Sequence, residues 1–327
     1  MKDRILELLR QESGYLSGLE MSTLLGVSRA AVWKAVEALR KEGYTIDSAP
    51  NRGYHLDAPT GRLSAREIAA RLDGHPWAEL VQVLDSVDST NNLAKTLAAQ
   101  GAPAGTVIVA DSQTGGRGRM GRSFVSPPGV GVYLSVILRP EAPPEELMHL
   151  TCAVAEVLCD GIEVASGLRP GIKWTNDLVS GGRKLCGILT ELSLEAESGH
   201  VQYAVVGAGV NCDQTLSDFP PEIRDMAGSL SMLTGKAVSR NTLAAEMIRA
   251  LSRLDGDLVE NRQEWMDRYR RDCVTIGRAV SVSRAGETRW GQAVDVDDRG
   301  ALLVDFGQGP EAVQSGEVSV RGMYGYV

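Results

Sequence analysis

Residues 113–122 read Gln-Thr-Gly-Gly-Arg-Gly-Arg-Met-Gly-Arg, which places four glycines and three arginines between Gly115 and Arg122. Glycine lets the backbone approach a ligand closely, and arginine supplies a planar, permanently charged fork of donors that fits a carboxylate or a phosphate. The stretch comes directly after an apolar run at residues 106–110, which is typical of a buried strand. The sequence therefore predicts an anion-binding loop at the end of a strand.

The residues after this stretch exclude two common phosphate-binding loops. Gly116 to Gly121 formally satisfies the GxGxxG spacing, but a dinucleotide-binding fold requires a helix directly after the glycines. Here the chain continues with Ser126-Pro-Pro-Gly129 and an apolar run at residues 132–138, which predicts a strand. The P-loop pattern fails as well, because no Gly-Lys-Ser/Thr closes the motif. We therefore expect a central mixed α/β domain in which the loop joins two strands.

A polar step, Ser89-Thr90-Asn91, stands between an apolar run at residues 81–84 and a helical pattern at residues 91–100. Ser89 or Thr90 can cap the helix, and a capped helix is one interpretation of the step. The same hydroxyl and amide groups also suit a neutral polar ligand that carries a urea or an amide. The local sequence leaves both interpretations open.

A second polar cluster, Lys173-Trp-Thr-Asn-Asp177, contains a lysine and an Asn-Asp pair, which suit a phosphate with Mg²⁺. A simple turn after a short strand is the alternative. Residues 181–191 predict a hairpin turn and a strand with Lys184 at its start, and Gly187 within that strand leaves room for a ligand. A further apolar strand is predicted at residues 205–211. Gly207 and Gly209 have no side chains there, so they also leave room for a ligand.

The first sixty residues predict three short helices and a hairpin. The second helix begins with a capping box, and the third, at residues 29–42, comes after a tight turn at residues 26–28 and ends at Gly43. Two short strands are predicted at residues 44–46 and 53–56. This order of elements is typical of a winged helix-turn-helix domain.

The third helix has a basic outer face. Val32, Val36 and Leu39 recur at helical spacing and should face the core. The net charge of −8 lies entirely beyond residue 60, which leaves this module free to approach nucleic acid. An interaction module with a solvated basic face is the alternative. We expect DNA contacts from Ser28, Arg29, Ala30, Trp33, Lys34 and, at the tip of the wing, Arg52.

The C-terminal third changes its periodicity. Residues 240–272 have a helical apolar pattern, and after Gly277 the period becomes two. The short strands predicted at residues 280–282, 289–294, 301–304 and 318–321 indicate a small SH3-like β-barrel. With a linker at residues 58–61, we expect an α+β protein of three domains, at residues 1–60, 61–272 and 273–327.

The composition bounds the class of protein. The chain has 327 residues, of which 43% are hydrophobic and 23% charged, as in a globular protein of two or three domains. No apolar run approaches the ~18 residues that a membrane span needs, and the N-terminus does not resemble a signal peptide. Five cysteines without CxxC spacing and four scattered histidines indicate reduced thiols and argue against a structural metal site. We therefore expect a cytoplasmic protein.

Together these segments closely resemble biotin–protein ligases, and with the N-terminal module they resemble the bifunctional kind that is also the biotin operon repressor. The Gly-Arg-Gly-Arg and Lys-Trp-x-Asn-Asp motifs in this order are highly specific, and the resemblance covers nearly the whole chain. Met120, Thr175 and Phe124 stand where the family can have arginine, proline and tryptophan, and none of these departures removes a group assigned to chemistry. The shared residues are Ser89-Thr-Asn91, Gln113, Gly116-Arg-Gly-Arg119, Gly121-Arg122, Lys173-Trp174, Asn176-Asp177, Lys184-Leu185, Gly187-Ile188 and Gly207-x-Gly-x-Asn211.

The resemblance implies a reaction in two steps. The carboxylate of biotin attacks the α-phosphate of MgATP to give biotinyl-5′-AMP, and a lysine of biotin carboxyl carrier protein then attacks this mixed anhydride. Lys184, Arg119 and Asp177 are the implied catalytic residues, with Asp177 either orienting the attacking lysine or binding Mg²⁺, and the arginine loop would close over the intermediate. The implied biotin- and adenylate-binding residues are Ser89, Thr90, Asn91, Gln113, Gly116, Arg117, Gly118, Arg119, Lys184, Gly187 and Asn211.

The resemblance also implies that biotinyl-5′-AMP acts as corepressor by strengthening a homodimer and, through it, binding to operator DNA. Two alternatives stay open. The chain can be a ligase for a related carboxylate such as lipoate, with the same class of reaction. It can also be a ligand-sensing transcription factor without ligase activity, which needs a pocket but neither Lys184 nor the arginine loop.

Overall fold

The computed structural model describes residues 1–11, 15–41, 44, 46–49, 52–56, 61–195, 197, 199–284, 287–314 and 319–322. The chain divides into two compact units, Met1–Arg62 and Leu63–Val327. The linker predicted at residues 58–61 lies outside the described residues except for Gly61. Each unit has its own hydrophobic core and is described by itself.

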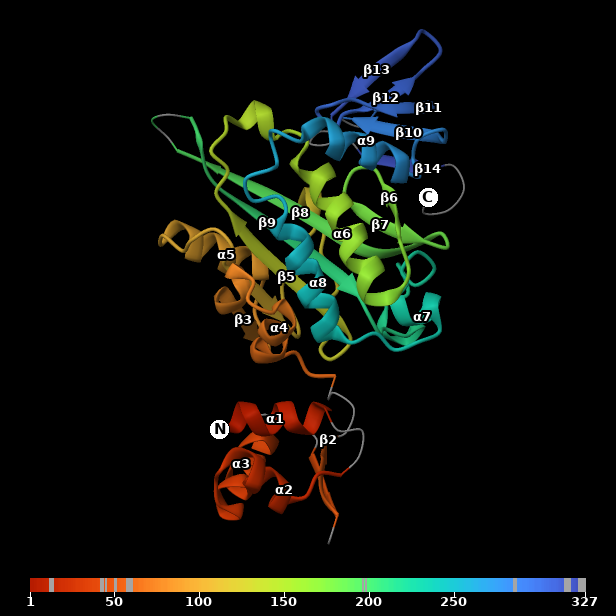
Figure 1. Ribbon diagram of the computed structural model, residues 1–327. Coiled ribbons are helices and arrows are strands. Elements are labelled where there is room, and N and C mark those ends of the chain that lie inside the picture. The colour runs from red at the N-terminus through yellow and green to blue at the C-terminus, as the bar shows by residue number, and fades with distance from the viewer. Residues whose placement is uncertain are drawn as a thin grey trace. The chain divides into compact units, whose positions relative to one another are not determined.

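The first unit has the helix and strand order of a winged helix-turn-helix, as predicted (Figure 1). Ser17 and Glu20 form the expected capping box, which satisfies two backbone N–H groups at the start of the second helix. Val32 and Leu39 of the third helix are buried against the first helix. The elements are α1 (Lys2–Gln11), α2 (Gly18–Leu25), α3 (Arg29–Lys41), β1 (Ile46–Ala49) and β2 (Gly53–Leu56).

The hairpin of this unit begins later than predicted, because strand β1 starts at Ile46 and not at Tyr44. The backbone N–H of Tyr44 donates to the carbonyl of Leu39 in α3 (3.1 Å), so Tyr44 is tied to α3 and does not pair in the hairpin. Four residues of β1 then pair antiparallel with the four of β2. The helix end predicted at Gly43 lies outside the described residues.

A mixed seven-stranded sheet forms the centre of the second unit, with the strand order β3-β4-β5-β9-β8-β7-β6. The pair β3·β4 is parallel and the others are antiparallel. The loop of glycines and arginines joins β4 to β5, as the sequence predicts. The strands are β3 (Val81–Leu84), β4 (Val107–Ala110), β5 (Gly131–Leu138), β6 (Gly171–Lys173), β7 (Asp177–Ser180), β8 (Arg183–Leu194) and β9 (Val201–Asn211).

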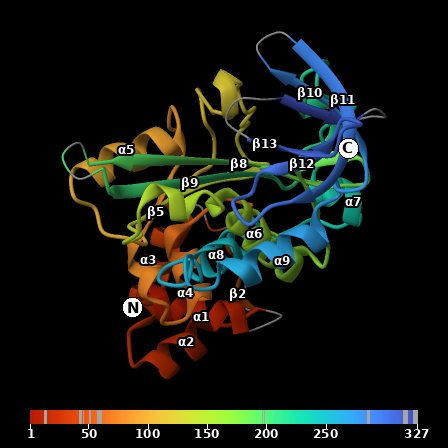
Figure 2. The same cartoon turned by 90° about the horizontal axis from the view of Figure 1, so that it is seen from above.

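Helices cover the two faces of this sheet unequally. Helix α5 packs with Ile108, Ile137 and Val205 on one face, and the larger core forms on the other face beneath α4, α6 and α8 (Figure 2). The single helix on the α5 face leaves the rest of that face open to other segments. The helices are α4 (Ala65–Leu72), α5 (Thr90–Ala99), α6 (Leu150–Ser166), α7 (Leu230–Thr234), α8 (Arg240–Ser252) and α9 (Arg262–Asp272).

The C-terminal sheet has five antiparallel strands in the order β13-β12-β11-β10-β14, and the α+β fold class is confirmed. The sequence missed β13, which begins with a proline, and the helical pattern at residues 240–272 is divided into α8 and α9 by a segment that contains Gly256 (φ 92°). The strands are β10 (Ala279–Arg284), β11 (Glu287–Val296), β12 (Leu302–Asp305), β13 (Pro310–Val313) and β14 (Ser319–Gly322).

All five cysteines are buried free thiols. Among the described residues, no group of three or more His, Cys, Asp and Glu side chains is placed to hold a metal ion. No helix in the described part of the chain combines the length and the apolar character that crossing a membrane requires.

Candidate functional site

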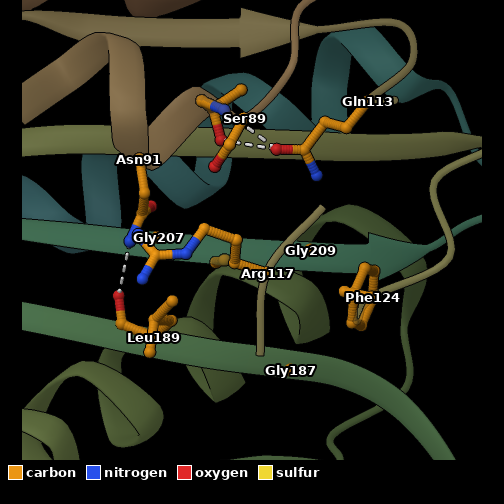
Figure 3. Close-up of a pocket in the computed structure, with 11 residues that line it drawn as sticks. Ser89, Asn91, Gln113, Arg117, Phe124, Gly187, Leu189, Gly207 and Gly209 are labelled. Carbon is orange, nitrogen blue, oxygen red and sulfur yellow. Dashed lines mark hydrogen bonds between the residues drawn. The ribbon is translucent and has the colours of Figure 1, made fainter. Parts of the chain in front are cut away.

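A pocket opens on the α5 face of the central sheet, and glycines form its floor (Figure 3). In the sheet, Gly207 pairs with Leu189 and Gly209 pairs with Gly187, so these residues of β8 and β9 face the same side. The space between its walls is about 310 Å³, part of which is open to solvent. Its lining residues are Ser89, Thr90, Asn91, Gln113, Arg117, Phe124, Gly187, Leu189, Gly207, Ala208 and Gly209.

Gly207 is required because Asn91 lies directly over it. A Cβ at position 207 would lie 2.0 Å from Oδ1 of Asn91, which is far inside van der Waals contact. Asn91 cannot retreat easily, since its Oδ1 accepts from Ser135 (2.6 Å) and its Nδ2 donates to the Leu189 carbonyl (3.2 Å). The absence of a side chain at position 207 therefore lets the amide of Asn91 reach the floor of the pocket.

The polar step at the start of α5 forms one end of the pocket. Ser89 is the N-cap of α5, which confirms the capped-helix interpretation, and the same residue also lines the pocket. Oε1 of Gln113 accepts from the backbone N–H (2.9 Å) and the hydroxyl (3.1 Å) of Thr90, and its Nε2 donates to Ser126 (2.9 Å). This network holds hydroxyl and amide groups of three segments around one end of the cavity.

The loop of glycines and arginines folds as a tight hairpin beside this end. Gly118 donates to the Arg122 carbonyl (2.7 Å) and Phe124 to the Gly116 carbonyl (2.9 Å). Gly116 has no room for a side chain, because a Cβ there would lie 2.3 Å from the Phe124 carbonyl. Arg117 lies at the pocket, where its Nη1 donates to Oδ1 of Asn92 (3.0 Å).

Arg119 connects this hairpin to the Lys-Trp-Thr-Asn-Asp segment. Its Nη1 donates to Oδ1 of Asn176 (3.0 Å), and Nδ2 of Asn176 donates to the Ile188 carbonyl (2.7 Å). Burial lowers the pKa of Arg119 from its ordinary value, and Asp177 opposes that shift. The guanidinium remains charged, and its partial burial strengthens its effect on any anion placed near it.

Lys184 and Asp177 form an ion pair at the other end of the pocket, with 2.6 Å between Nζ and Oδ1. Asp177 pairs with Gly187 in the sheet, and Nζ of Lys184 lies 5.9 Å from the centre of the Phe124 ring. The pair Gly187·Gly209 lies two residues along the strands from Leu189·Gly207, which is about 7 Å. The cavity thus runs from a neutral polar end at Asn91 along a glycine floor to Gly187 and Phe124, beside which the Lys184–Asp177 ion pair lies.

The structure brings most of the predicted binding residues together. Ser89, Thr90, Asn91, Gln113, Arg117 and Gly187 line the pocket, and Gly116, Gly118 and Arg119 build the hairpin beside it. Lys184 and Asn211 are absent from the pocket lining: Lys184 pairs with Asp177 beside Gly187, and Nδ2 of Asn211 donates to the backbone carbonyl of Gly228 (3.0 Å).

Sequence reasoning missed two polar residues behind the pocket wall. Ser135 is fully buried in β5, and its hydroxyl oxygen lies 2.6 Å from Oδ1 of Asn91 and 2.8 Å from Oγ1 of Thr90. Glu191 of β8 accepts from Nδ2 of Asn91 (2.9 Å). A serine inside an otherwise apolar strand was the available signal for Ser135, since buried hydroxyl groups need partners.

In the N-terminal unit, the five residues predicted on the outer face of α3 are exposed: Ser28, Arg29, Ala30, Trp33 and Lys34. Trp33 has 53% of its surface exposed, which is high for a tryptophan and leaves its ring free for a partner. Arg52 is exposed too, with its guanidinium 4.4 Å from the centre of the Tyr15 ring. These side chains form a basic, partly aromatic surface.

Comparison with protein families gives three matches along the chain. Residues 2–55 match a helix-turn-helix (HTH) domain, residues 83–211 match the biotin/lipoate A/B protein ligase family, and residues 275–321 match the C-terminal domain of biotin protein ligases.

Full-length relatives and solved structures agree with these matches. The chain is 35% identical to the bifunctional ligase/repressor BirA of Bacillus subtilis and 31% identical to the protein of that name from Escherichia coli. Both alignments cover 98% of this chain, with 98% and 99% of the relatives. The biotin protein ligase from Aquifex aeolicus in complex with biotin and ATP aligns with a TM-score of 0.63 at 28% identity, over 74% of this chain and 98% of that one.

Proposed function

This chain belongs to the family of bifunctional biotin–protein ligases and repressors, and from that membership we propose that it uses ATP to attach biotin to a lysine of biotin carboxyl carrier protein and represses biotin genes. The single observation that carries the ligase half is the pocket, which joins a neutral polar end to the Lys184–Asp177 pair across a glycine floor. Biotin has the matching shape, with a ureido ring at one end and a carboxylate at the other.

The hydrogen bonds at the polar end orient the ureido ring. Both Nδ2 protons of Asn91 are taken by Leu189 and Glu191, so Asn91 has only its Oδ1 to offer and accepts from a ureido N–H. The Ser89 hydroxyl and the second Nε2 proton of Gln113 donate to the ureido carbonyl. This assignment places the aliphatic chain over Gly207 and Gly209 and directs the carboxylate toward Lys184.

The chemistry at the other end brings two anions together. A carboxylate oxygen of biotin attacks the α-phosphorus of ATP, the bond to the bridging oxygen breaks, and pyrophosphate leaves with that electron pair. Lys184 and Arg119 offset the repulsion between the anions and the charge that develops on the phosphate. The amine of the carrier lysine then attacks the carbonyl of the anhydride, loses a proton and displaces AMP.

Asp177 has a defined place in this proposal. Its contact with Lys184 holds the ammonium group beside Gly187 and Phe124, where the carboxylate of biotin arrives. Asp177 would supply an acidic side chain beside Lys184 for the Mg²⁺ that accompanies the triphosphate of ATP, and this ion would help to neutralise the phosphate charge. The neighbouring hairpin of Gly116, Gly118 and Arg117 then covers the adenylate, and Asn211 supports the adenine side through its backbone contacts.

Lipoate ligation is the second candidate, since the matched family includes lipoate ligases. Lipoate has a carboxylate but no ureido ring, so Ser89, Asn91 and Gln113 would be left without partners. We expect isothermal titration to give a dissociation constant for biotin at least about 10²-fold lower than for lipoate. Equal affinities would contradict the assignment of the polar end.

The repressor half rests on the N-terminal unit. We assign residues 1–60 to a DNA-binding domain, residues 61–272 to the ligase domain and residues 273–327 to the C-terminal domain. Biotinyl-5′-AMP acts as corepressor by favouring a homodimer, whose two winged helices meet two half-sites of operator DNA. The protein works in the cytoplasm, where ATP, the carrier protein and DNA are available.

The basic face of α3 predicts a measurable salt dependence. Replacing Arg29 or Lys34 by alanine should weaken operator binding by about tenfold and reduce the slope of log affinity against log salt by about one for each phosphate contact. Fluorescence anisotropy with labelled operator DNA over a salt series measures both quantities. Lys236→Ala, an exposed lysine of the second unit, is the matched control and should change neither. Unchanged slopes for the α3 variants would remove Arg29 and Lys34 from the DNA interface.

A further inference from the structure

Glu191 joins three segments around the pocket without lining it. Its Oε1 accepts from Nζ of Lys95 (2.8 Å) and from Nη1 of Arg117 (3.1 Å), and its Oε2 accepts from Nδ2 of Asn91 (2.9 Å). Lys95 and Asn91 belong to α5, Arg117 belongs to the arginine hairpin, and Glu191 belongs to β8. A single carboxylate thus ties the helix and the hairpin to the sheet.

The charge on Glu191 determines which of the two amide atoms of Asn91, Nδ2 or Oδ1, points toward the carboxylate. An ionised carboxylate only accepts hydrogen bonds, so it selects the NH₂ group of Asn91 and turns Oδ1 toward Ser135 and the pocket. Burial alone would raise the pKa of Glu191, but the hydrogen bonds from Lys95 and Asn91 hold that pKa below its ordinary value. The carboxylate is therefore ionised at neutral pH and keeps the NH₂ group of Asn91 facing it.

The same carboxylate restrains Arg117. The Arg117 side chain is 42% exposed, and a long exposed side chain loses considerable rotamer freedom when it is fixed in one place. Its Nη1 is held between Glu191 and Oδ1 of Asn92 (3.0 Å). These two contacts limit the rotamers of Arg117 and hold its guanidinium beside the pocket.

We propose that Glu191 is a positioning residue for biotin, which acts by fixing the amide of Asn91 in the orientation that receives the ureido ring and by holding the guanidinium of Arg117 beside the pocket. This inference rests on the proposed function and deepens it, since it assigns biotin recognition to a residue outside the cavity. Because Glu191 is remote from the Lys184–Asp177 pair at the other end of the floor, it contributes to binding of biotin and not to the chemical step.

The test is Glu191→Gln, which preserves size and removes the charge. The glutamine has one accepting oxygen, so it either loses its bond from Asn91 or presents an NH₂ group to Lys95 and Arg117. We expect the dissociation constant for biotin, measured by isothermal titration, to rise about tenfold or more. The kcat for pyrophosphate release at saturating biotin, and the KM for ATP, should stay within about twofold.

Lys95→Gln is the matched control. It removes one donor from the same carboxylate but leaves the contacts of Glu191 with Asn91 and Arg117. Asn91 and Arg117 still lower the pKa of Glu191 in this variant, and a partly exposed ion pair contributes little, so biotin affinity should stay within about twofold. Thermal unfolding of both variants checks that they are folded, and only a folded Glu191→Gln protein with weakened biotin binding fits the proposal.

The outcomes separate this inference from the function it rests on. If the wild-type protein binds biotin and Glu191→Gln binds it equally well, the positioning role is overturned while the proposed function stands. If kcat falls as much as affinity, or Lys95→Gln weakens binding as much as Glu191→Gln, Glu191 has only a general structural role. If the wild-type protein does not bind biotin, the proposed function and the inference both fail.

Discussion

Replacing Lys184 by glutamine is expected to slow formation of biotinyl-5′-AMP by about 10²–10³-fold. Nζ of Lys184 is paired with Asp177 beside the Gly187 end of the pocket, where the carboxylate and the α-phosphate must meet. Glutamine keeps a hydrogen-bond donor but removes the charge that offsets their repulsion, and it leaves Asp177 without this cation. Both effects raise the barrier to the chemical step and leave the polar end of the pocket intact.

The measurement is pyrophosphate release in a single turnover, together with biotin affinity by isothermal titration. Biotin affinity should fall much less than the rate, since Ser89, Asn91 and Gln113 are untouched. Lys184→Arg is the matched variant, because it keeps the charge but replaces a compact ammonium by a planar fork, and it should retain an intermediate rate. A Lys184→Gln protein that forms the adenylate at the wild-type rate would remove Lys184 from the catalytic step.

Replacing Gly207 by alanine is expected to weaken biotin binding by more than about 10²-fold. The new Cβ would lie 2.0 Å from Oδ1 and 2.8 Å from Cγ of Asn91. Asn91 is short and is hydrogen-bonded on both sides by Ser135 and Leu189, so it has to leave its position for the methyl group to fit. The displaced amide then no longer offers its oxygen to the ureido ring.

Gly187→Ala tests a second glycine of the pocket floor, where a smaller loss of biotin affinity is expected. A Cβ at position 187 would meet only the ends of the Lys184 and Phe124 side chains, at 3.1 Å each. These flexible ends can move by a few tenths of an ångström, so we expect biotin affinity to fall by about tenfold or less. Isothermal titration of both variants measures the difference. Gly207→Ala binding biotin as tightly as Gly187→Ala would contradict the place given to Asn91.

Local chemistry explains which parts of the fold the sequence predicts well. The capping box at Ser17 and Glu20 acts within four residues, so it identifies the start of α2 without tertiary information. The first strand of the wing was misplaced because its position depends on pairing with β2 and on the end of α3. The division between α8 and α9 was missed because the apolar pattern continues through the segment that carries Gly256.

In the candidate site too, residues recognised from their neighbours in sequence were predicted, and residues that depend on tertiary contacts were missed. Ser89 and Asn91 were predicted because their residue types at the start of a helix suit a polar ligand, and Gln113 was predicted from the resemblance to biotin–protein ligases. Glu191 was missed because its role depends on contacts between segments that are distant in sequence. The register of β8 with β9 places it beside α5 and the hairpin, and its partners Lys95 and Arg117 are 96 and 74 residues away in sequence. The contacts of Asn211 with Gly228 likewise depend on a loop that the sequence does not place.

The most direct test of the account is transfer of biotin to a carrier. The protein is incubated with MgATP, biotin and an isolated biotin carboxyl carrier domain, and the mass of the carrier is measured with and without ATP. The account predicts one biotin on one lysine of the carrier, dependent on ATP and lost with Lys184→Gln. A carrier that stays unmodified in the presence of folded protein, ATP and biotin would contradict it.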